Sequence, residues 1–258
     1  MPKDTAMTVS IYGKDKRQGY AKEYLMKAGA AVGGHVVLLP VPSSKDGIHI
    51  TGTDETLDDV IANTRGGDIL VGYGIDRARR EAIAAMGVTL VDLSRDEKYL
   101  ADNAELTAVG TLGRILAEER RVPADLSIGI IGCGRIGQRL LHLFCMLGAR
   151  VRAFTSKREL ARDLCMLGIS GIDSLTLESR TSADSFLGLD ILINTAPARL
   201  IPREAASVLS DTRVIELAGG DNIPTAIPYE RFASVPAEMY PESAGRVLGS
   251  AVLRILGE

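Results

Sequence analysis

The sequence predicts an α/β protein of two domains: a small flavodoxin-like or Rossmann-like domain, then a Rossmann dinucleotide-binding domain. Short β-branched or apolar runs alternate with amphipathic stretches along the chain, which is typical of parallel sheets covered by helices. A glycine-rich turn, "GCGRIG", follows one of the apolar runs in the second half. The 258 residues are also enough to form two modest hydrophobic cores.

The first domain is expected to span residues 1–121, with a helix at its end that connects it to the second domain. The apolar runs predict strands at 8–12, 35–39, 68–72 and 88–93. Helical spacing predicts helices near 18–28, 57–63 and 76–86, and then the connecting helix at 103–121.

The second domain is expected to span residues 122–258, because "RVPADLS" is a polar turn with a proline that suits a boundary near 121–126. Five apolar runs predict strands at 128–131, 150–154, 190–194, 213–217 and 232–235. The tail "ESAGRVLGSAVLRILGE" is apolar at helical spacing. It predicts a last helix that returns to the first domain.

Composition excludes several function classes. The net charge of −3, without a basic stripe, argues against nucleic acid as the main partner. No apolar run is long enough to span a bilayer, and "MPKDTAMTVSIYG" contains no signal-peptide core, so we expect a cytoplasmic protein without a membrane partner. The cysteines at 133, 145 and 165 are odd in number and lack metal-ligand spacing, which indicates reduced thiols and no metal site.

The glycine-rich turn predicts a dinucleotide site. Gly132 permits a tight turn out of the strand, Gly134 lets the backbone approach a pyrophosphate, and Gly137 allows close packing of helix on strand. Arg135 and Ile136 open the helix, whose free N–H groups and positive dipole end favour an anion. The alternative is a Rossmann-like domain that binds nothing at this turn.

The next strand ends in residues that favour NADP(H). An acidic residue there would bind the ribose hydroxyls of NAD, whereas the chain has Thr155, Ser156, Lys157 and Arg158. Hydroxyl groups and two cations suit a 2′-phosphate. The alternative is that Lys157 and Arg158 only solvate the start of the next helix.

Two further strand ends should border the ligand, because ligands of open parallel sheets lie at the carboxyl ends of the strands. "DILINTAPARLIP" places Asn194, Thr195, Ala196 and Pro197 there, beside the nicotinamide half. "RVIELAGGDN" adds Ala218 and a glycine pair that allows close backbone approach. Pro197 could equally serve only to end its strand.

These motifs, in this order, resemble the A subunit of dipicolinate synthase, whose nucleotide domain is similar to that of D-2-hydroxyacid dehydrogenases. The resemblance covers most of the chain and depends on "YGKDKRQ", "LLPVPSSKDG", "NAELTAVGTLGRIL", "GCGRIGQRL", "DILINTAPARLI" and "YPESAGRVLGSAVLRIL". It implies NADP(H)-linked formation of pyridine-2,6-dicarboxylate from a dihydrodipicolinate-type intermediate of the lysine pathway, in sporulating bacteria. It also implies a partner, a flavoprotein-like B subunit, and we expect a homo-oligomer.

A dicarboxylate substrate needs cations or oriented N–H groups in the first domain. Two loops that follow strands should project from the carboxyl edge of the first sheet, and the connecting helix should line the wall. The candidate substrate residues are Arg17, Gln18, Ser43, Ser44, Lys45, Thr107 and Thr111. The alternative is that the loop lysines are only solvated charges.

The sequence identifies no general acid. A hydroxyacid dehydrogenase would use a histidine oriented by a carboxylate, but His35, His49 and His142 do not lie where that chemistry requires one. Tyr240 and Glu242, near the last helix, are alternatives. Three functions therefore stay open: a dipicolinate synthase-like oxidoreductase, a non-catalytic or regulatory NADP-binding protein, and a D-2-hydroxyacid dehydrogenase-like enzyme.

Overall fold

The computed structural model describes residues 7–29, 35–155, 173–175 and 182–255. The chain forms two compact units, one from Met1–Leu106 with Pro236–Glu258 and the other from Thr107–Val235. Both units have a parallel sheet covered by helices, which confirms the predicted fold class.

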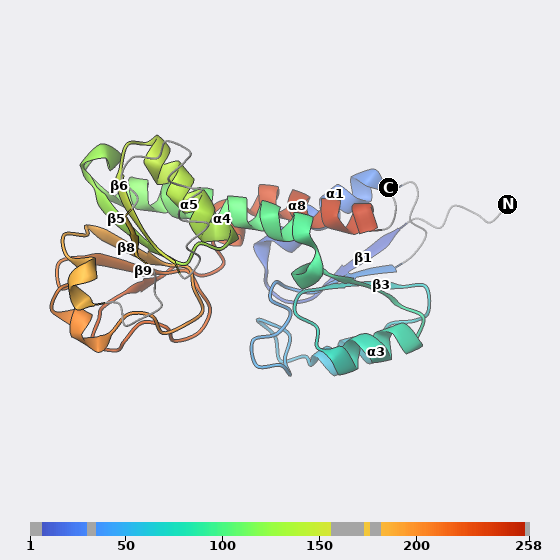
Figure 1. The fold of residues 1–258 in the computed structure, drawn as a ribbon. Helices are drawn as coiled ribbons and strands as arrows, with labels where there is room; N and C mark the ends of the chain where they lie inside the picture. The colour runs from blue at the N-terminus through green and yellow to red at the C-terminus, as the bar shows by residue number, and fades with distance from the viewer. Residues whose placement is uncertain (1–6, 30–34, 156–172, 176–181, 256–258) are drawn as a thin grey trace. The chain divides into compact units, whose positions relative to one another are not determined.

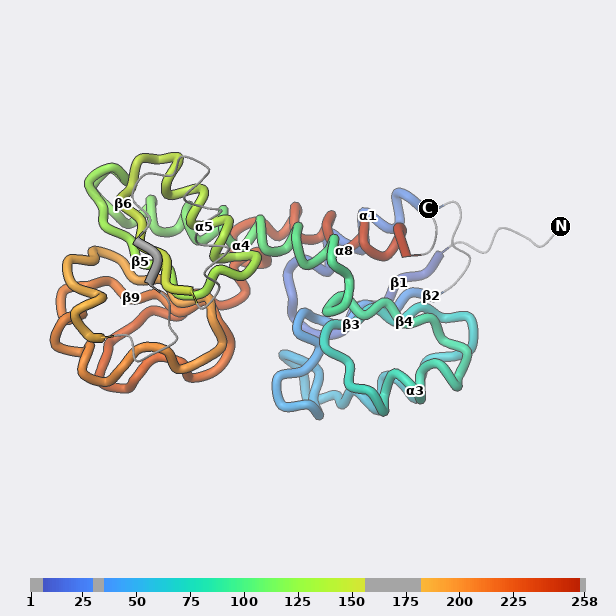
Figure 2. Tube along the Cα trace, viewed as in Figure 1, coloured from blue at the N-terminus to red at the C-terminus, as the bar shows by residue number. Residues whose placement is uncertain are grey.

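The first unit holds a four-stranded parallel sheet whose strands lie in sequence order. Its strands are β1 (Thr8–Ile11), β2 (His35–Leu38), β3 (Ile69–Gly72) and β4 (Thr89–Asp92). Its helices are α1 (Lys16–Ala28), α2 (Leu57–Ala62), α3 (Arg77–Ala85) and the 3-10 helix η1 (Leu93–Arg95), with α7 (Val235–Met239) and α8 (Pro241–Ile255) from the end of the chain. Figures 1 and 2 show α3 beside this sheet, and α1 packs along α8.

The two faces of this sheet carry different side chains, because residues alternate along each strand. Val36 and Leu38 join the core cluster that includes α1 and α8, and Val37 and Leu39 join the cluster beneath α2 and α3. Helices therefore cover both faces, as in other parallel sheets.

The second unit holds a six-stranded parallel sheet. Its strands are β5 (Ser127–Ile131), β6 (Arg150–Phe154), β7 (Asp173–Leu175), β8 (Ile191–Asn194), β9 (Arg213–Glu216) and β10 (Glu230–Arg231). Its helices are α5 (Arg135–Met146) and the 3-10 helices η2 (Pro123–Asp125), η3 (Ala183–Phe186) and η4 (Arg203–Ala206), while α4 (Glu97–Glu118) runs through both units.

The strand order of this sheet is β10-β9-β8-β5-β6-β7. On one side of β5 the sheet continues with β6 and β7. The chain then returns to the other side of β5, where β8, β9 and β10 follow in order. This is the order of a dinucleotide-binding Rossmann sheet, and the reversal between β5 and β8 is the point where such sheets bind ligands.

Three expected boundaries differ in the structure. The last strand pairs Glu230 and Arg231 with β9, not residues 232–235, because Phe232 turns into the core and Ser234 has a φ of 50°. The connecting helix starts at Glu97 rather than 103. The two units divide at Leu106 and Thr107, inside α4, upstream of the expected boundary at 121–126.

The last helix, α8, belongs to the first unit and contacts α1 along its length. Among the described helices, none combines the length and the apolar character needed to cross a bilayer.

Candidate functional site

The glycine-rich turn has the geometry that its three glycines predict. Gly132 has a φ of +89°, in the left-handed region that favours glycine. A Cβ at Gly137 would lie 1.9 Å from the carbonyl oxygen of Gly132, so α5 packs on the turn with no room for a side chain. Around Gly134, in contrast, no atom of the described part of the chain outside its immediate neighbours lies within 4 Å of a Cβ position.

The start of α5 presents an open anion-binding end. Its N-cap is Gly134, which has no side chain to accept from the first N–H groups. The first turn of α5, described in full, contains no acidic residue. The start of α5 without a side-chain cap and the open space at Gly134 therefore fit a pyrophosphate.

The β8 loop is tied to the glycine turn by Thr195. Its backbone N–H donates to the Ile131 carbonyl at 2.9 Å, and its hydroxyl lies 2.9 Å from that oxygen and 3.0 Å from the Gly132 carbonyl. A Cβ at Gly132 would lie 2.8 Å from the Thr195 hydroxyl oxygen. The loop that was expected to border the nicotinamide half thus packs directly on the glycine-rich turn.

A buried carboxyl group lies at the same sheet edge. Glu216, the last residue of β9, is fully buried and accepts from Asn194 Nδ2, at 3.1 Å for Oε1 and 3.0 Å for Oε2. The Ala218 N–H donates to its Oε1 at 2.8 Å. Burial raises the pKa of Glu216 above its ordinary value, although the hydrogen bonds from Asn194 and Ala218 oppose this.

Two arginines hold the loop after β9. Arg231 donates from Nη1 to the Ala218 carbonyl at 3.1 Å and from Nη2 to the Gly220 carbonyl at 2.8 Å. Arg199, from the segment after β8, donates to the Asp221 carbonyl at 3.0 Å. The glycine pair of this loop is therefore held in place from two neighbouring segments.

The remaining cofactor candidates are placed as follows. Thr155 is buried at the end of β6, whereas Ser156, Lys157 and Arg158 lie outside the described residues. Ala196 is half-buried and Pro197 is exposed. Arg135 and Ile136 form the first turn of α5. All the described cofactor candidates lie at or beside the carboxyl ends of β5, β6, β8 and β9.

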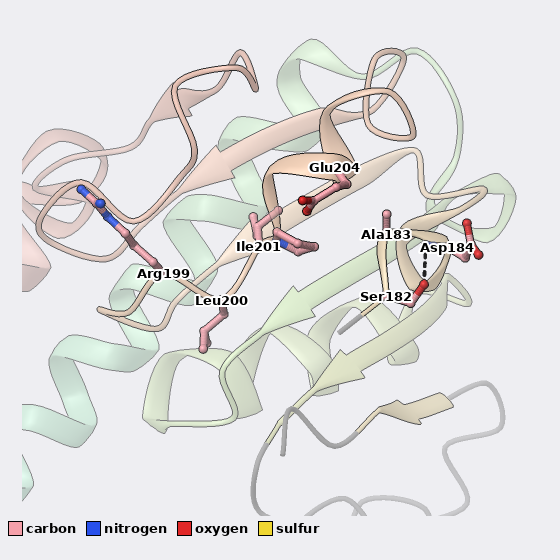
Figure 3. Close-up of a pocket in the computed structure, with 8 residues that line it drawn as sticks. Ser182, Ala183, Asp184, Arg199, Leu200, Ile201 and Glu204 are labelled. Carbon is pink, nitrogen blue, oxygen red and sulfur yellow. Dashed lines mark hydrogen bonds between the residues drawn. The ribbon is translucent and has the colours of Figure 1, made fainter. Parts of the chain in front are cut away.

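A separate pocket of about 840 Å³ lies between η3 and the segment that follows β8. Figure 3 shows Arg199 at one end and Ser182 with Asp184 at the other. Asp184 and Glu204 both line it, against one arginine. Its two carboxylates make it a poor phosphate site compared with the start of α5.

In the first unit, Arg17 is buried rather than exposed in a loop. Its Nε donates to Asp15 Oδ1 at 2.9 Å, and the side chains are only 3% and 8% exposed. Arg17 Nη1 lies 3.4 Å from the Tyr99 hydroxyl and 3.5 Å from Asn103 Oδ1. Burial raises the pKa of Tyr99 to about 12, so its hydroxyl stays protonated at neutral pH.

Two other substrate candidates have structural partners. Gln18 is buried and donates to the Leu38 carbonyl at 3.0 Å. Ser43 is buried, and its hydroxyl accepts from the Tyr73 N–H at 2.7 Å. Both residues hold the loops at the carboxyl edge of the first sheet.

The loop after β2 carries a carboxylate–histidine pair. Asp46 lies 2.8 Å from His49 Nδ1 and also accepts from the Ser44 hydroxyl at 3.0 Å. The hydrogen bond from His49 is the largest cause that lowers the pKa of Asp46 far below its ordinary value. Lys45 is exposed in the same loop. Sequence reasoning treated His49 as a loop residue, although the spacing in "DGIH" allows this contact.

Thr107 and Thr111 lie on the part of α4 that belongs to the second unit. Thr107 is buried, and the Thr111 Oγ1 is buried without a hydrogen-bond partner among the described residues. Glu242, on α8 in the first unit, is exposed and lies 3.4 Å from Arg246. Tyr240 donates its N–H to the Pro236 carbonyl just before α8.

Sequence reasoning missed Glu216. The run "RVIEL" predicts a buried strand, and an acid at the end of such a strand is the signal that could have identified it. A buried acid must be satisfied by specific donors, which marks a candidate functional position. Within the described residues, no group of three or more His, Cys, Asp or Glu side chains could hold a metal ion.

Neither the protein-family models nor the curated proteins include a match to this sequence. Solved structures do match. The A subunit of dipicolinate synthase from Bacillus halodurans has a TM-score of 0.76 at 20% identity, with 98% of each chain covered. The corresponding dipicolinate synthase chain from Bacillus subtilis has a TM-score of 0.74 at 19% identity, covering 97% of this chain and 95% of that chain.

A dehydrogenase in an NAD-complexed form is also similar. The D-isomer specific 2-hydroxyacid dehydrogenase from Lactobacillus delbrueckii ssp. bulgaricus has a TM-score of 0.52 at 12% identity, with 97% of this chain and 95% of that chain covered. At these sequence identities, the similarities show the fold alone. The chain has the fold of the dipicolinate synthase A subunit, which is related to that of the D-2-hydroxyacid dehydrogenases.

Proposed function

We propose that this protein is an NADP(H)-dependent oxidoreductase that forms pyridine-2,6-dicarboxylate from a dihydrodipicolinate-type intermediate of the lysine pathway. The observation that carries the proposal is the open space around Gly134. It lies at the uncapped start of α5, where the strand order reverses between β5 and β8. The fold shared with the A subunit of dipicolinate synthase supports the choice of reaction.

The choice of NADP(H) over NAD(H) rests on the sequence after β6. Thr155 directly follows β6, and the next residues are Ser156, Lys157 and Arg158, with no carboxylate at the strand end. A carboxylate there would bind the ribose hydroxyls of NAD and repel a 2′-phosphate. Hydroxyl groups and cations instead attract a 2′-phosphate.

The reaction is an oxidation. Aromatisation of a dihydropyridine ring removes one hydride and one proton, and NADP⁺, when bound, supplies the hydride acceptor. The start of α5 and the turn that Thr195 closes would hold the coenzyme in place. This arrangement positions the reacting groups rather than activating them.

Lys45 is the substrate candidate best suited to a substrate carboxylate, because it is a cation on an exposed loop. Arg17 is only 3% exposed and its guanidinium is held by Asp15, so it stabilises the start of α1 instead.

The test is turnover by the full chain with NADP⁺ and freshly prepared dihydrodipicolinate-type substrate, with and without a flavoprotein-like B subunit. We expect pyridine-2,6-dicarboxylate and NADPH in equal amounts, and none from the Gly134→Val variant. Coenzyme binding without turnover under both conditions would instead support a regulatory role. Failure to bind either NADP⁺ or NAD⁺ would overturn the proposal.

The pair Asp46–His49 favours a second candidate, a D-2-hydroxyacid dehydrogenase-like enzyme, because such enzymes use a histidine oriented by a carboxylate. If this candidate is right, the protein will reduce a 2-oxo acid with NADPH. The His49→Gln variant will then lose that activity and keep coenzyme binding. Lack of any 2-oxo acid reduction by the wild type would remove this candidate.

The setting of the reaction also belongs to the proposal. The odd number of cysteines, without metal-ligand spacing, supports a cytoplasmic protein. We expect it to form a homo-oligomer and to bind a B subunit. Size-exclusion chromatography with light scattering, of the chain alone and mixed with a B subunit, tests both.

A further inference from the structure

We propose that Glu216 is a positioning residue for the coenzyme, acting through Asn194 on the loop that follows β8. This inference rests on the proposed coenzyme site. It adds a role for a buried carboxylate that the proposed reaction does not otherwise use.

The two side chains are neighbours across the sheet. Asn194 ends β8 and Glu216 ends β9, and the two residues are paired in the register of the strands. Asn194 is 1% exposed and Glu216 is fully buried. Water therefore cannot replace the contacts between them, so the Asn194 amide nitrogen and the Glu216 carboxylate depend on each other.

The carboxylate fixes which way the Asn194 amide faces. An ionised carboxylate only accepts hydrogen bonds, so the amide nitrogen must point toward Glu216. Its oxygen then faces the Ala196 N–H, from which it accepts at 3.2 Å, and its nitrogen also lies 3.0 Å from the Ala196 carbonyl. The other amide orientation would place two donors against each other at Ala196.

The orientation of this amide reaches the pyrophosphate turn in one further step. Thr195, between Asn194 and Ala196, is bonded to the carbonyls of Ile131 and Gly132. Two sets of hydrogen bonds, joined by the backbone of residues 194–196, thus connect Glu216 to the turn that would receive the coenzyme. Buried polar networks of this kind act as a unit when every member is satisfied.

Protonation of Glu216 would release the constraint. A neutral carboxyl group can donate as well as accept, so it tolerates both orientations of the Asn194 amide. From β8 the group that faces Glu216 is the neutral Asn194. From β10 it is the cation Arg231, which also lies 3.7 Å from the exposed Asp221. We therefore expect the ionised form to bind the coenzyme more tightly.

The effects of pH on stability and on binding have opposite signs. Because burial raises the pKa of Glu216 in the folded state, protonation of this group favours folding as the pH falls through that pKa. The proposal says that coenzyme affinity falls over the same range. A purely structural role for Glu216 would not weaken binding when the fold becomes more stable.

The experiment measures the affinity for NADP⁺ by calorimetry from about pH 8 to about pH 5, a range above the ordinary pKa of glutamate. The proteins are the full-length wild type, Glu216→Gln, and Asp221→Asn as a control that removes an exposed carboxylate of the next loop. We expect Glu216→Gln to bind at least tenfold more weakly at the upper end of the range. The wild type should weaken toward acid pH more than Glu216→Gln does, and Asp221→Asn should follow the wild type.

A second variant keeps the test decisive if Glu216→Gln folds poorly. The exchange Glu216→Gln with Asn194→Asp restores one carboxylate and one amide, so it should recover most of the affinity. Equal affinity and an equal pH profile for wild type and Glu216→Gln would overturn the proposal, as would a lower melting temperature without a change in binding. No binding by the wild type at any pH would instead overturn the coenzyme site itself.

Discussion

At the residue scale, each of the three positions in the turn is glycine for a different physical reason. Gly132 adopts a positive φ and lies against Thr195, and Gly137 leaves no room for a Cβ. Gly134 has an ordinary φ of −76° and open space around it. The fold therefore requires the first and third glycines, whereas the second is free to serve a ligand.

Gly134 and Gly137 should respond differently to substitution. Gly134→Val should abolish dinucleotide binding and leave the melting temperature nearly unchanged, because its side chain would fill only open space. Gly137→Ala should cost about 2 kcal/mol or more, or roughly 4–8 °C in melting temperature, because its Cβ would overlap a backbone oxygen. Calorimetry and thermal unfolding measure the two effects. Unchanged affinity in folded Gly134→Val would contradict the assigned site.

The buried pair of Asp15 and Arg17 gives a stability prediction. Arg17→Met should lower the free energy of unfolding by about 3–5 kcal/mol, because it leaves the Asp15 carboxylate buried without its cation. The double variant with Asp15→Asn should recover part of this loss. Urea unfolding of the three proteins tests it. A loss that the second substitution does not reduce would mean that the pair itself contributes little.

The roles of the three glycines could be predicted from the sequence. The role of Glu216 and the burial of Arg17 could not. The glycine roles follow from local spacing, which a sequence contains directly. The contact of Glu216 with Asn194 depends on which strands are neighbours, and the two residues are separated along the chain by η4. Arg17 was expected to face a substrate from a loop, but α1 begins at Lys16 and places it beside Tyr99.

At the element scale, α1 and α8 pack closely because glycines on α8 face α1. A Cβ at Gly245 would lie 2.5 Å from the Tyr20 Cβ and 2.6 Å from the Arg17 carbonyl oxygen. Gly19, on α1 itself, has open space around its Cβ position within the described residues. The two helices come from opposite ends of the chain, and this contact holds the last helix in the first unit.

These two glycines should give stability changes of opposite sign. Gly245→Ala should destabilise the protein by about 2 kcal/mol or more, because backbone atoms of α1 would have to move. Gly19→Ala should stabilise it by about 0.5–1 kcal/mol, since alanine loses less backbone entropy in a helix. Thermal unfolding of both variants provides the comparison. A neutral Gly245→Ala variant would mean that α1 and α8 do not pack this tightly.

Most elements could be predicted, because β5, β6 and β9 are short strands of 4–5 residues, rich in β-branched or apolar side chains, that are bounded by turns. The position of the last strand could not be predicted from the sequence. Phe232 looks like a strand residue in the sequence, but its ring packs under the Arg114 guanidinium, with 3.9 Å from Cζ to the ring centroid. The partner on α4 is more than a hundred residues away in the chain, so local pattern does not contain it.

At the scale of the whole molecule, the second unit has a Rossmann strand order and the first has four strands in sequence order. Alternation of strands and helices predicted parallel sheets, because parallel strands need helical crossovers. The apolar helical spacing of the tail predicted a last helix that returns to the first domain, and residues 236–258 belong to the first unit. The sequence could not predict that this helix packs on α1, because that contact is long-range packing.

The most direct test of the central claim is the affinity for NADPH and for NADH, measured by calorimetry at low and high salt. The proteins are the wild type and the double variant Lys157→Ala with Arg158→Ala. We predict that the wild type binds NADPH more tightly and that added salt narrows the difference. The double variant should lose about tenfold or more in NADPH affinity, since charge-assisted hydrogen bonds contribute about 1.5–3 kcal/mol each, while NADH binding hardly changes. A wild type that prefers NADH, or a double variant that loses both coenzymes equally, would contradict the assignment of NADP(H).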